Sequence, residues 1–177
     1  MYATGPFEIN LGPSVFESLA SQFLIRALVN ERTTKSMSDV IVTSLANLRN
    51  EVRYGTGHLL ITDEPASAGG EDAGPDPYTL LLAALGSCIS MTTMLYARRK
   101  AWPVESVTIH LRQKRIHGSD CAECVEKPEG FIHRIERRVT LAGNLTEEQR
   151  IRLQEIAHKC PVHKTLTSPI VISDMQI

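Results

Sequence analysis

The chain has 177 residues, of which 42% are hydrophobic and 22% are charged, a profile typical of one globular domain with its own core. Lys and Arg number 19 and Asp and Glu number 20, so the net charge of −1 argues against a dedicated nucleic-acid-binding protein. Four cysteines are too few for a disulfide-stapled secreted scaffold of this length.

Residues 1–36 are predicted to form a helical appendage before a main domain of residues 37–177. Apolar residues at i, i+4 spacing indicate a helix over residues 14–30. The first ten residues carry Glu8 and no Lys or Arg, so they do not have the pattern of a secretory signal. We therefore expect a cytoplasmic protein.

The main domain begins with strand patterns. Val40, Val42 and Leu45 are apolar, and residues 58–62 form a short β-like run of His-Leu-Leu-Ile-Thr. A loop rich in Gly, Ala, Pro and acidic residues follows over residues 63–76.

A long apolar helix is predicted from Pro77 to about Lys100. Asp76 before Pro77 is typical of an N-cap followed by proline at the first helical position. Residues 77–97 carry no charge and could span a bilayer, which needs about 20 apolar residues. However, a single span would leave Gly86 and the Ser and Thr residues without partner helices, whereas a soluble core accepts such a helix. We therefore expect a buried core helix and no membrane association.

The second half of the domain combines a long hairpin with a further helix. Residues 107–111 and 131–141 alternate apolar and polar, which predicts two antiparallel strands joined across residues 118–130. Thr146 and Gln149 have the spacing of a capping box, and the helix that follows is predicted to end at Pro161. Residues 170–172 are predicted to form a last strand.

This order of elements predicts an α+β domain in which helices pack against an antiparallel sheet. The long uncharged helix needs cover on every side, which a single layer of this size provides poorly. We therefore expect a homodimer that shares its two central helices.

Two cysteines lie on the predicted helices. Cys88 lies in mid-helix beside Gly86 and Ser87, small residues that leave room for a group to approach, although a free cysteine is more often a small buried hydrophobe. Cys160 lies on the buried stripe at the end of the second helix. If the helices pack together, the two residues come within disulfide range, with Cα atoms roughly 4.4–6.8 Å apart.

The other two cysteines, Cys121 and Cys124, form a C-x-x-C motif in the hairpin loop. Its spacing leaves three interpretations open: a structural metal site, a redox pair, or two inert thiols. Together with Cys160 and His163, the motif also matches the spacing of a zinc site with three cysteines and one histidine.

From about Val40 to Ile177 the chain resembles the OsmC/Ohr family of thiol-dependent hydroperoxide reductases. The resemblance is carried by GPDPYTLLLAALGSC at residues 74–88 and by IAHKCPVH at residues 156–163. Residues 117–124, followed by Ile-Glu-Arg at residues 135–137, resemble a subgroup described as OsmC-like.

The resemblance implies antiparallel sheets wrapped around two central helices in an intertwined homodimer, with active sites at the interface. Cys88 would be the peroxidatic cysteine, whose sulfenic acid is resolved by Cys160 as a disulfide. The implied substrate is an organic hydroperoxide, and a dithiol or small thiol is the reductant. No cofactor is implied.

The family also supplies an arginine from an N-terminal strand, which favours the thiolate. Arg53 is our candidate, with Arg49 second. Thr79 and Tyr78 occupy the positions nine and ten residues before the first cysteine, where the family usually carries a glutamate. Neither can form an ion pair with an arginine at neutral pH. We expect the substrate pocket to include Tyr78, Thr79 and Leu85.

A thiol peroxidase that uses Cys88, Cys160 and Arg53 is thus the leading hypothesis. One alternative is a non-catalytic protein with a structural zinc site at Cys121, Cys124, Cys160 and His163. Another is a protein of the same fold that binds hydrophobic small molecules.

Overall fold

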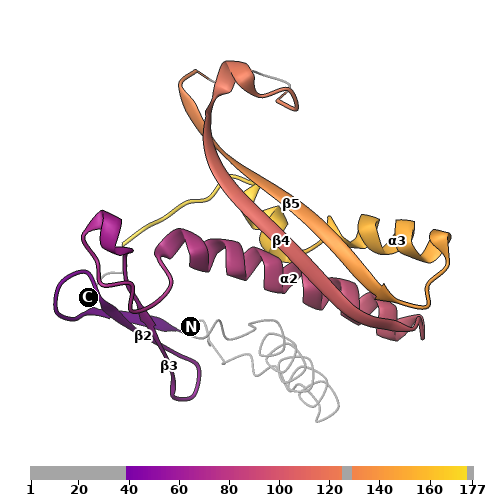
Figure 1. The fold of residues 1–177 in the computed structure, drawn as a ribbon, viewed down its shortest axis with the longest axis horizontal. Helices are drawn as coiled ribbons and strands as arrows, with labels where there is room; N and C mark the ends of the chain where they lie inside the picture. The colour runs from indigo at the N-terminus through magenta and orange to yellow at the C-terminus, as the bar shows by residue number, and fades with distance from the viewer. Residues whose placement is uncertain (1–38, 125–128, 175–177) are drawn as a thin grey trace, which may run out of the picture. The chain divides into compact units, whose positions relative to one another are not determined.

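A computed structural model describes residues 39–124 and 129–174 (Figure 1). The predicted appendage of residues 1–36 lies outside this range. The described residues divide into two compact units. The first unit holds the described residues up to Thr43 together with Val52–Leu60, and the second holds Ser44–Glu51 and the described residues from Ile61 onward.

Three short strands precede the first described α-helix and form a sheet in the order β1-β2-β3. The strands predicted near residues 40–45 and at residues 58–62 are confirmed as β1 and β3. The central strand β2, with the sequence Asn-Glu-Val-Arg-Tyr, has too few apolar residues for the pattern to indicate it. The bounds of these strands and of the following 3-10 helix are β1 (Val40–Ser44), β2 (Asn50–Tyr54), β3 (His58–Thr62) and η1 (Ala66–Ala68).

The loop that leads from β3 to the long helix is organised around a buried carboxylate. Asp63 is only 2% exposed, and its carboxylate accepts the backbone N–H groups of Glu64, Glu71 and Ala73 at 2.9, 2.9 and 3.2 Å. Burial raises the pKa of Asp63, but these three donors and the nearby Arg49 charge outweigh burial and hold the pKa below its usual value. The carboxylate therefore stays ionised and fixes the loop.

Helix α2 (Pro77–Arg99) confirms the predicted long helix and its start. The Asp76 carboxylate accepts the N–H groups of Tyr78 and Thr79 at 2.8 and 3.0 Å, and Pro77 takes the first helical position. Among the described residues it is the one helix whose length and composition would allow it to cross a membrane. One stripe of α2 is buried within the chain, and its members are Leu85, Ile89, Thr93 and Ala97.

The predicted hairpin is confirmed as β4 (Val104–His117) and β5 (Phe131–Gly143), which pair antiparallel along most of their length. Figure 1 shows the hairpin crossing over α2. Gly86 on α2 allows this approach, because a Cβ atom there would lie 3.1 Å from the Leu111 Cδ1. The inner face of the hairpin packs on the core through Ile109, Leu111, Ile135 and Val139. The hairpin loop contains the short 3-10 helix η2 (Gly118–Asp120).

Helix α3 (Glu147–Ala157) begins at the predicted capping box of Thr146 and Gln149. Its predicted end at Pro161 is wrong, since α3 stops at Ala157 and Pro161 instead begins α4 (Pro161–Leu166). A proline satisfies the first helical position because its missing N–H has no intrahelical partner there.

The predicted last strand at residues 170–172 is also wrong. These residues form neither helix nor strand, and Val171 and Ile172 are 90% and 91% exposed. A β-like sequence forms a strand only when a neighbouring strand offers its free N–H and C=O groups. No described strand of this chain pairs with residues 170–172. The fold class is nevertheless α+β, as predicted.

Candidate active site

Cys88 is positioned by the middle of α2. The residue is half-buried and packs against the core cluster that contains Leu85 and Ile89. Its sulfur accepts the backbone N–H of Val162, in the first turn of α4, at 3.5 Å. Val162 is 74 residues away in the chain, so this contact joins the two segments in which the sequence placed the functional thiols.

Cys160 is positioned by the break between α3 and α4. It is the N-cap residue of α4, in an extended backbone conformation, and its sulfur accepts the N–H of His163 at 3.3 Å. The residue is fully buried, as predicted, although it caps a new helix and does not end the old one. Both Cys88 and Cys160 are free thiols within one hydrophobic cluster.

The surroundings of Cys160 keep its thiol protonated. Burial raises the pKa of Cys160, the His163 N–H lowers it, and interaction with the Cys88 thiol raises it further. The net pKa lies above its usual value. The structure thus brings two thiols into interaction, one partly accessible and one buried with its proton.

Arg137 is a residue of this site that the sequence analysis did not identify. It lies on β5 opposite Leu111, in the phase of the strand that faces the core. Its Nη1 donates to the Ala157 carbonyl at 3.2 Å and its Nη2 contacts the Nδ1 of His158. Burial lowers the pKa of Arg137, and attraction to Cys160 opposes that shift. The positive charge of the guanidinium therefore favours the thiolate form of Cys160.

His158 is the second hydrogen-bond partner of the Arg137 guanidinium. Burial lowers the pKa of His158 below 6.5, and the charges of Arg137 and His163 lower it further. A neutral imidazole is the form that can accept the Arg137 donor at Nδ1. His158 therefore helps to hold the guanidinium in place while remaining uncharged at neutral pH.

The two candidate arginines are placed differently from one another. Arg53 lies on β2 and, within the first unit, lines a hollow of about 640 Å³. Cys88 and Cys160 both belong to the second unit, so the predicted contact of Arg53 with Cys88 stays a prediction. Arg49, the second candidate, forms an ion pair of 3.7 Å with Glu71 in the loop before α2.

The three predicted pocket residues do not share one environment. Tyr78 is 55% exposed and stacks on His133, and it lines a surface depression of about 350 Å³ together with Thr79. The Thr79 hydroxyl donates to the Asp76 carboxylate, which is the N-cap of α2. Leu85, in contrast, is buried in the core cluster with Cys160.

A second depression, of about 300 Å³, opens beside the Cys160 turn. It is lined from the turn by Pro161 and from α2 by Thr92, which lies one helical turn after Cys88. Leu95 and Ile156 give it apolar walls, and Tyr96, Arg99 and Lys159 complete its lining.

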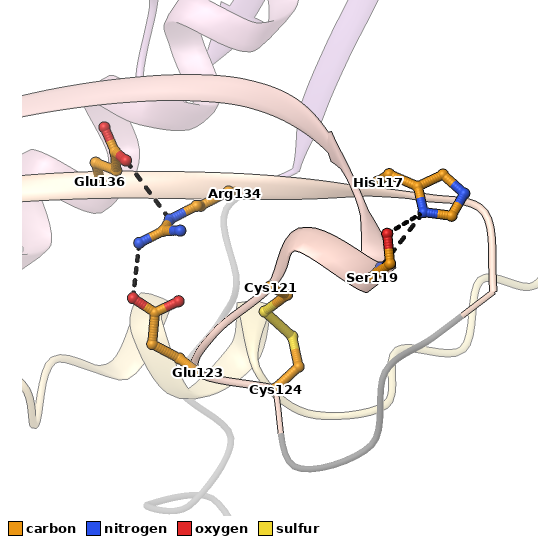
Figure 2. The surroundings of a disulfide bond; sticks show 7 residues. All are labelled: His117, Ser119, Cys121, Glu123, Cys124, Arg134 and Glu136. Atoms are coloured by element: carbon orange, nitrogen blue, oxygen red, sulfur yellow. Dashed lines mark hydrogen bonds and ion pairs between the residues drawn. A yellow bond between two sulfur atoms is a disulfide. The ribbon is translucent and has the colours of Figure 1, made fainter.

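The predicted zinc site is wrong. Cys121 and Cys124 are joined to each other in a disulfide (Figure 2), and Cys160 is instead in the core cluster with Leu85. Within residues 39–124 and 129–174, no three His, Cys, Asp or Glu side chains form a group that could hold a metal ion. Spacing along the chain matched a zinc site, but the fold does not bring its members together.

Comparison with known proteins identifies a protein family that matches this chain. A family model described as OsmC-like protein matches residues 69–173, more than half of the sequence. No curated protein matches the chain.

Several solved structures have the same fold. An OsmC like protein from Mycoplasma pneumoniae is 16% identical, with a TM-score of 0.58, and the match covers 75% of this chain and 89% of that one. An organic hydroperoxide resistance protein from Elizabethkingia anophelis is 20% identical, with a TM-score of 0.57 and coverage of 76% and 91%. The organic hydroperoxide resistance protein OsmC from Legionella pneumophila is 19% identical, with a TM-score of 0.54 and coverage of 75% and 92%.

The lowered pKa of His158 predicts a pH-dependent stability. Protonation of His158 is less favourable in the folded chain than in the unfolded chain, where its pKa is close to 6.5. We expect the free energy of unfolding to decrease as the pH falls below about 6.5. In His158→Asn this part of the pH dependence should disappear, as measured by urea unfolding between pH 8 and pH 5.

His110→Asn is the matched control, because it removes another histidine, one that is exposed on β4. It should retain the pH dependence of the unmodified chain. Identical curves for His158→Asn and the unmodified chain would contradict a lowered pKa of His158 in the folded chain.

Proposed function

Because this chain belongs to the OsmC-like protein family, we propose that it is a thiol-dependent peroxidase that reduces organic hydroperoxides. Structural relatives include proteins named for organic hydroperoxide resistance, which supports a peroxide-related role in stress. The observation that carries the proposal is the meeting of two free thiols, Cys88 and Cys160, in one buried cluster.

In the proposed oxidative step, the Cys88 thiolate attacks the terminal oxygen of the hydroperoxide. The O–O bond breaks, the leaving alkoxide takes up a proton from solvent and departs as the alcohol, and Cys88 becomes a sulfenic acid. Cys160 then attacks the Cys88 sulfur and releases water, which leaves a Cys88–Cys160 disulfide. Two observations support this division of roles. Cys88 is partly accessible, so a hydroperoxide can reach it, whereas Cys160 is buried and its raised pKa keeps it protonated in the resting protein.

In the proposed reductive step, an external dithiol opens the Cys88–Cys160 disulfide by exchange and leaves as its own disulfide. One hydroperoxide and one dithiol thus yield one alcohol, one water and one oxidised dithiol. No organic cofactor takes part. The proposed location is the cytoplasm, where thiol reductants are abundant.

Arg137 is the proposed cation for the attack of Cys160 on the Cys88 sulfenic acid. Cys160 must lose its proton to attack, and burial alone makes that unfavourable. The guanidinium is held toward the α3–α4 turn by the Ala157 carbonyl and His158, so its charge favours the Cys160 thiolate. For Cys88 the proposed cation is Arg53.

The alkyl part of the substrate would bind to the apolar walls of the depression beside the turn. Leu95 and Ile156 wall this depression, and Thr92 places it one turn from Cys88. Burial of apolar substrate surface there contributes about 25 cal/mol per Å². This term favours organic hydroperoxides over hydrogen peroxide. Tyr78 and Thr79, at the start of α2, are the other proposed substrate contacts.

We also propose that the active protein is an intertwined homodimer. Met91 and Leu95 on α2 are 64% and 54% exposed in the single chain, although the helix carries no charge between Pro77 and Ala97. Ile170, Val171 and Ile172 are exposed as well. A second chain would cover the free side of α2 and could offer a strand to residues 170–172.

The peroxidase proposal predicts the fate of each thiol. Treatment with cumene hydroperoxide should remove the two free thiols per chain, as counted by a colorimetric thiol reagent, and dithiothreitol should restore them. Cys88→Ser should lose none. Cys160→Ser should retain a sulfenic acid on Cys88 that dimedone traps and mass spectrometry detects.

A protein that only binds hydrophobic ligands would keep both thiols in the presence of peroxide and consume none. That outcome, or equal oxidation of the unmodified chain and Cys88→Ser, would reject the peroxidase proposal.

The role of Arg137 predicts a shift in the pH profile of disulfide formation. In Arg137→Met the pKa of Cys160 should rise, so the Cys160 thiolate fraction at pH 7 should fall about tenfold for each unit of change. Closure of the Cys88–Cys160 disulfide after peroxide treatment, followed by quenched mass spectrometry, should slow accordingly and recover at higher pH.

Arg137→Lys is the matched variant, since it keeps the charge and loses the forked geometry. It should restore part of the rate at pH 7. A loss that is the same at every pH would indicate a packing role only and would contradict the electrostatic assignment.

The dimer proposal predicts that a charge on the exposed side of α2 separates the chains. Met91→Glu should halve the mass measured by light scattering and lower peroxidase activity, because a buried carboxylate without a partner is costly. Asn144→Glu, in the exposed turn after β5, should remain dimeric. A monomeric mass for the unmodified chain would refute the dimer.

A further inference from the structure

The base of the β4–β5 hairpin loop is closed by a backbone hydrogen bond. The strands pair as far as His117 and Phe131, and the Gly118 N–H donates to the Gly130 carbonyl at 2.7 Å, which closes the base of the loop. Arg134 on β5 binds Glu123 in the loop at 2.6 Å and Glu136 at 3.5 Å. The loop is therefore held to the hairpin by backbone pairing and by ion pairs.

Within this loop Cys121 and Cys124 are joined in a disulfide with only two residues between them (Figure 2). A cross-link constrains the unfolded chain less as the loop that it closes becomes shorter, and this ring is among the shortest possible. This effect on stability is therefore small for a ring of this size, so stability alone does not account for the disulfide.

The two cysteines of the disulfide differ in access. Cys121 is 6% exposed and its N–H donates to the Gly118 carbonyl at 3.1 Å, whereas Cys124 is more exposed. Thiol–disulfide exchange requires an in-coming thiolate to reach one sulfur while the other leaves. This asymmetry favours attack at Cys124 and departure of Cys121.

The residues around the disulfide are polar and of both charges. Figure 2 shows Arg134 with Glu123 and Glu136, and His117, whose Nδ1 bonds to the Ser119 hydroxyl at 2.8 Å. Such surroundings differ from the apolar cluster that holds Cys88 and Cys160.

We propose that Cys121 and Cys124 form a second redox-active disulfide, which exchanges electrons with an external dithiol. A thiolate of the dithiol attacks the Cys124 sulfur, the disulfide breaks, and Cys121 leaves as a thiolate that takes up a proton. The second thiol of the reductant then attacks the mixed disulfide, releases Cys124 as a thiol and leaves as a cyclic disulfide. Two electrons and two protons pass to the protein. This site does not depend on the proposed peroxidase.

The test uses the full chain with Cys88→Ser and Cys160→Ser, so that only the second disulfide can titrate. The protein is equilibrated under native conditions in buffers of rising reduced-to-oxidised dithiothreitol ratio, quenched with acid, alkylated and weighed by mass spectrometry. We expect a reversible change from no adduct to two adducts, at Cys121 and Cys124, with an unchanged circular dichroism spectrum. A bond that opens only in denaturant, loss of the fold on opening, or thiols that stay free in oxidised buffer would overturn the proposal.

Two matched single variants test the order of attack. With Cys121→Ser or Cys124→Ser added to that background, one cysteine remains and is challenged with a disulfide-containing probe. We expect mixed-disulfide formation to be several-fold faster at Cys124 than at Cys121, and equal or reversed rates would overturn the assigned order. In a chain with Cys121→Ser and Cys124→Ser but with Cys88 and Cys160 intact, peroxide consumption with dithiothreitol should persist. The two proposals can therefore fail separately.

Discussion

The contact between the middle of α2 and the turn that joins α3 to α4 is the constraint on which this structure depends. Two elements distant in sequence must pack closely enough for the Val162 N–H to reach the Cys88 sulfur. The absence of a side chain at Gly86 lets the hairpin approach α2, and the hairpin in turn supports α3 from the other side through Val139 and Leu141. Any change that separates these layers also separates the thiols.

Burial of the site disfavours the charged form of Cys160. An apolar cluster disfavours the thiolate of Cys160, yet the chemistry that we propose requires that thiolate briefly. Arg137 resolves this conflict because its guanidinium reaches the cluster from β5 and is satisfied there by the Ala157 carbonyl and a neutral His158. A half-buried guanidinium is thus held by a carbonyl and an imidazole.

Much of the fold could be predicted because local rules govern it. Asp76 and Pro77 mark the start of α2, the alternation in residues 131–141 marks β5, and Thr146 with Gln149 marks α3. The strand expected at residues 170–172 failed because strand formation depends on an available partner, which a local pattern does not contain. The zinc site failed for a similar reason, since spacing does not show that Cys121 and Cys124 close on each other.

The site was only partly predictable. The pairing of Cys88 with Cys160 followed from the family resemblance, and the structure places both in one cluster. Arg137 was missed although a signal was present: it interrupts the apolar phase of β5 between Ile135 and Val139. An arginine on the core-facing side of a strand needs hydrogen-bond partners from the fold. The alternation of apolar and polar residues predicts the strand but does not distinguish such an arginine from its apolar neighbours.

Cys160 has two roles. Its sulfur would enter the redox cycle, and the same sulfur caps α4 by accepting the His163 N–H. Oxidation of this sulfur therefore perturbs the first turn of a six-residue helix at the same moment as it changes the chemistry. Serine is a preferred cap residue and alanine is not. A serine in this position separates the loss of the thiol from the loss of the helix start, whereas an alanine confounds the two.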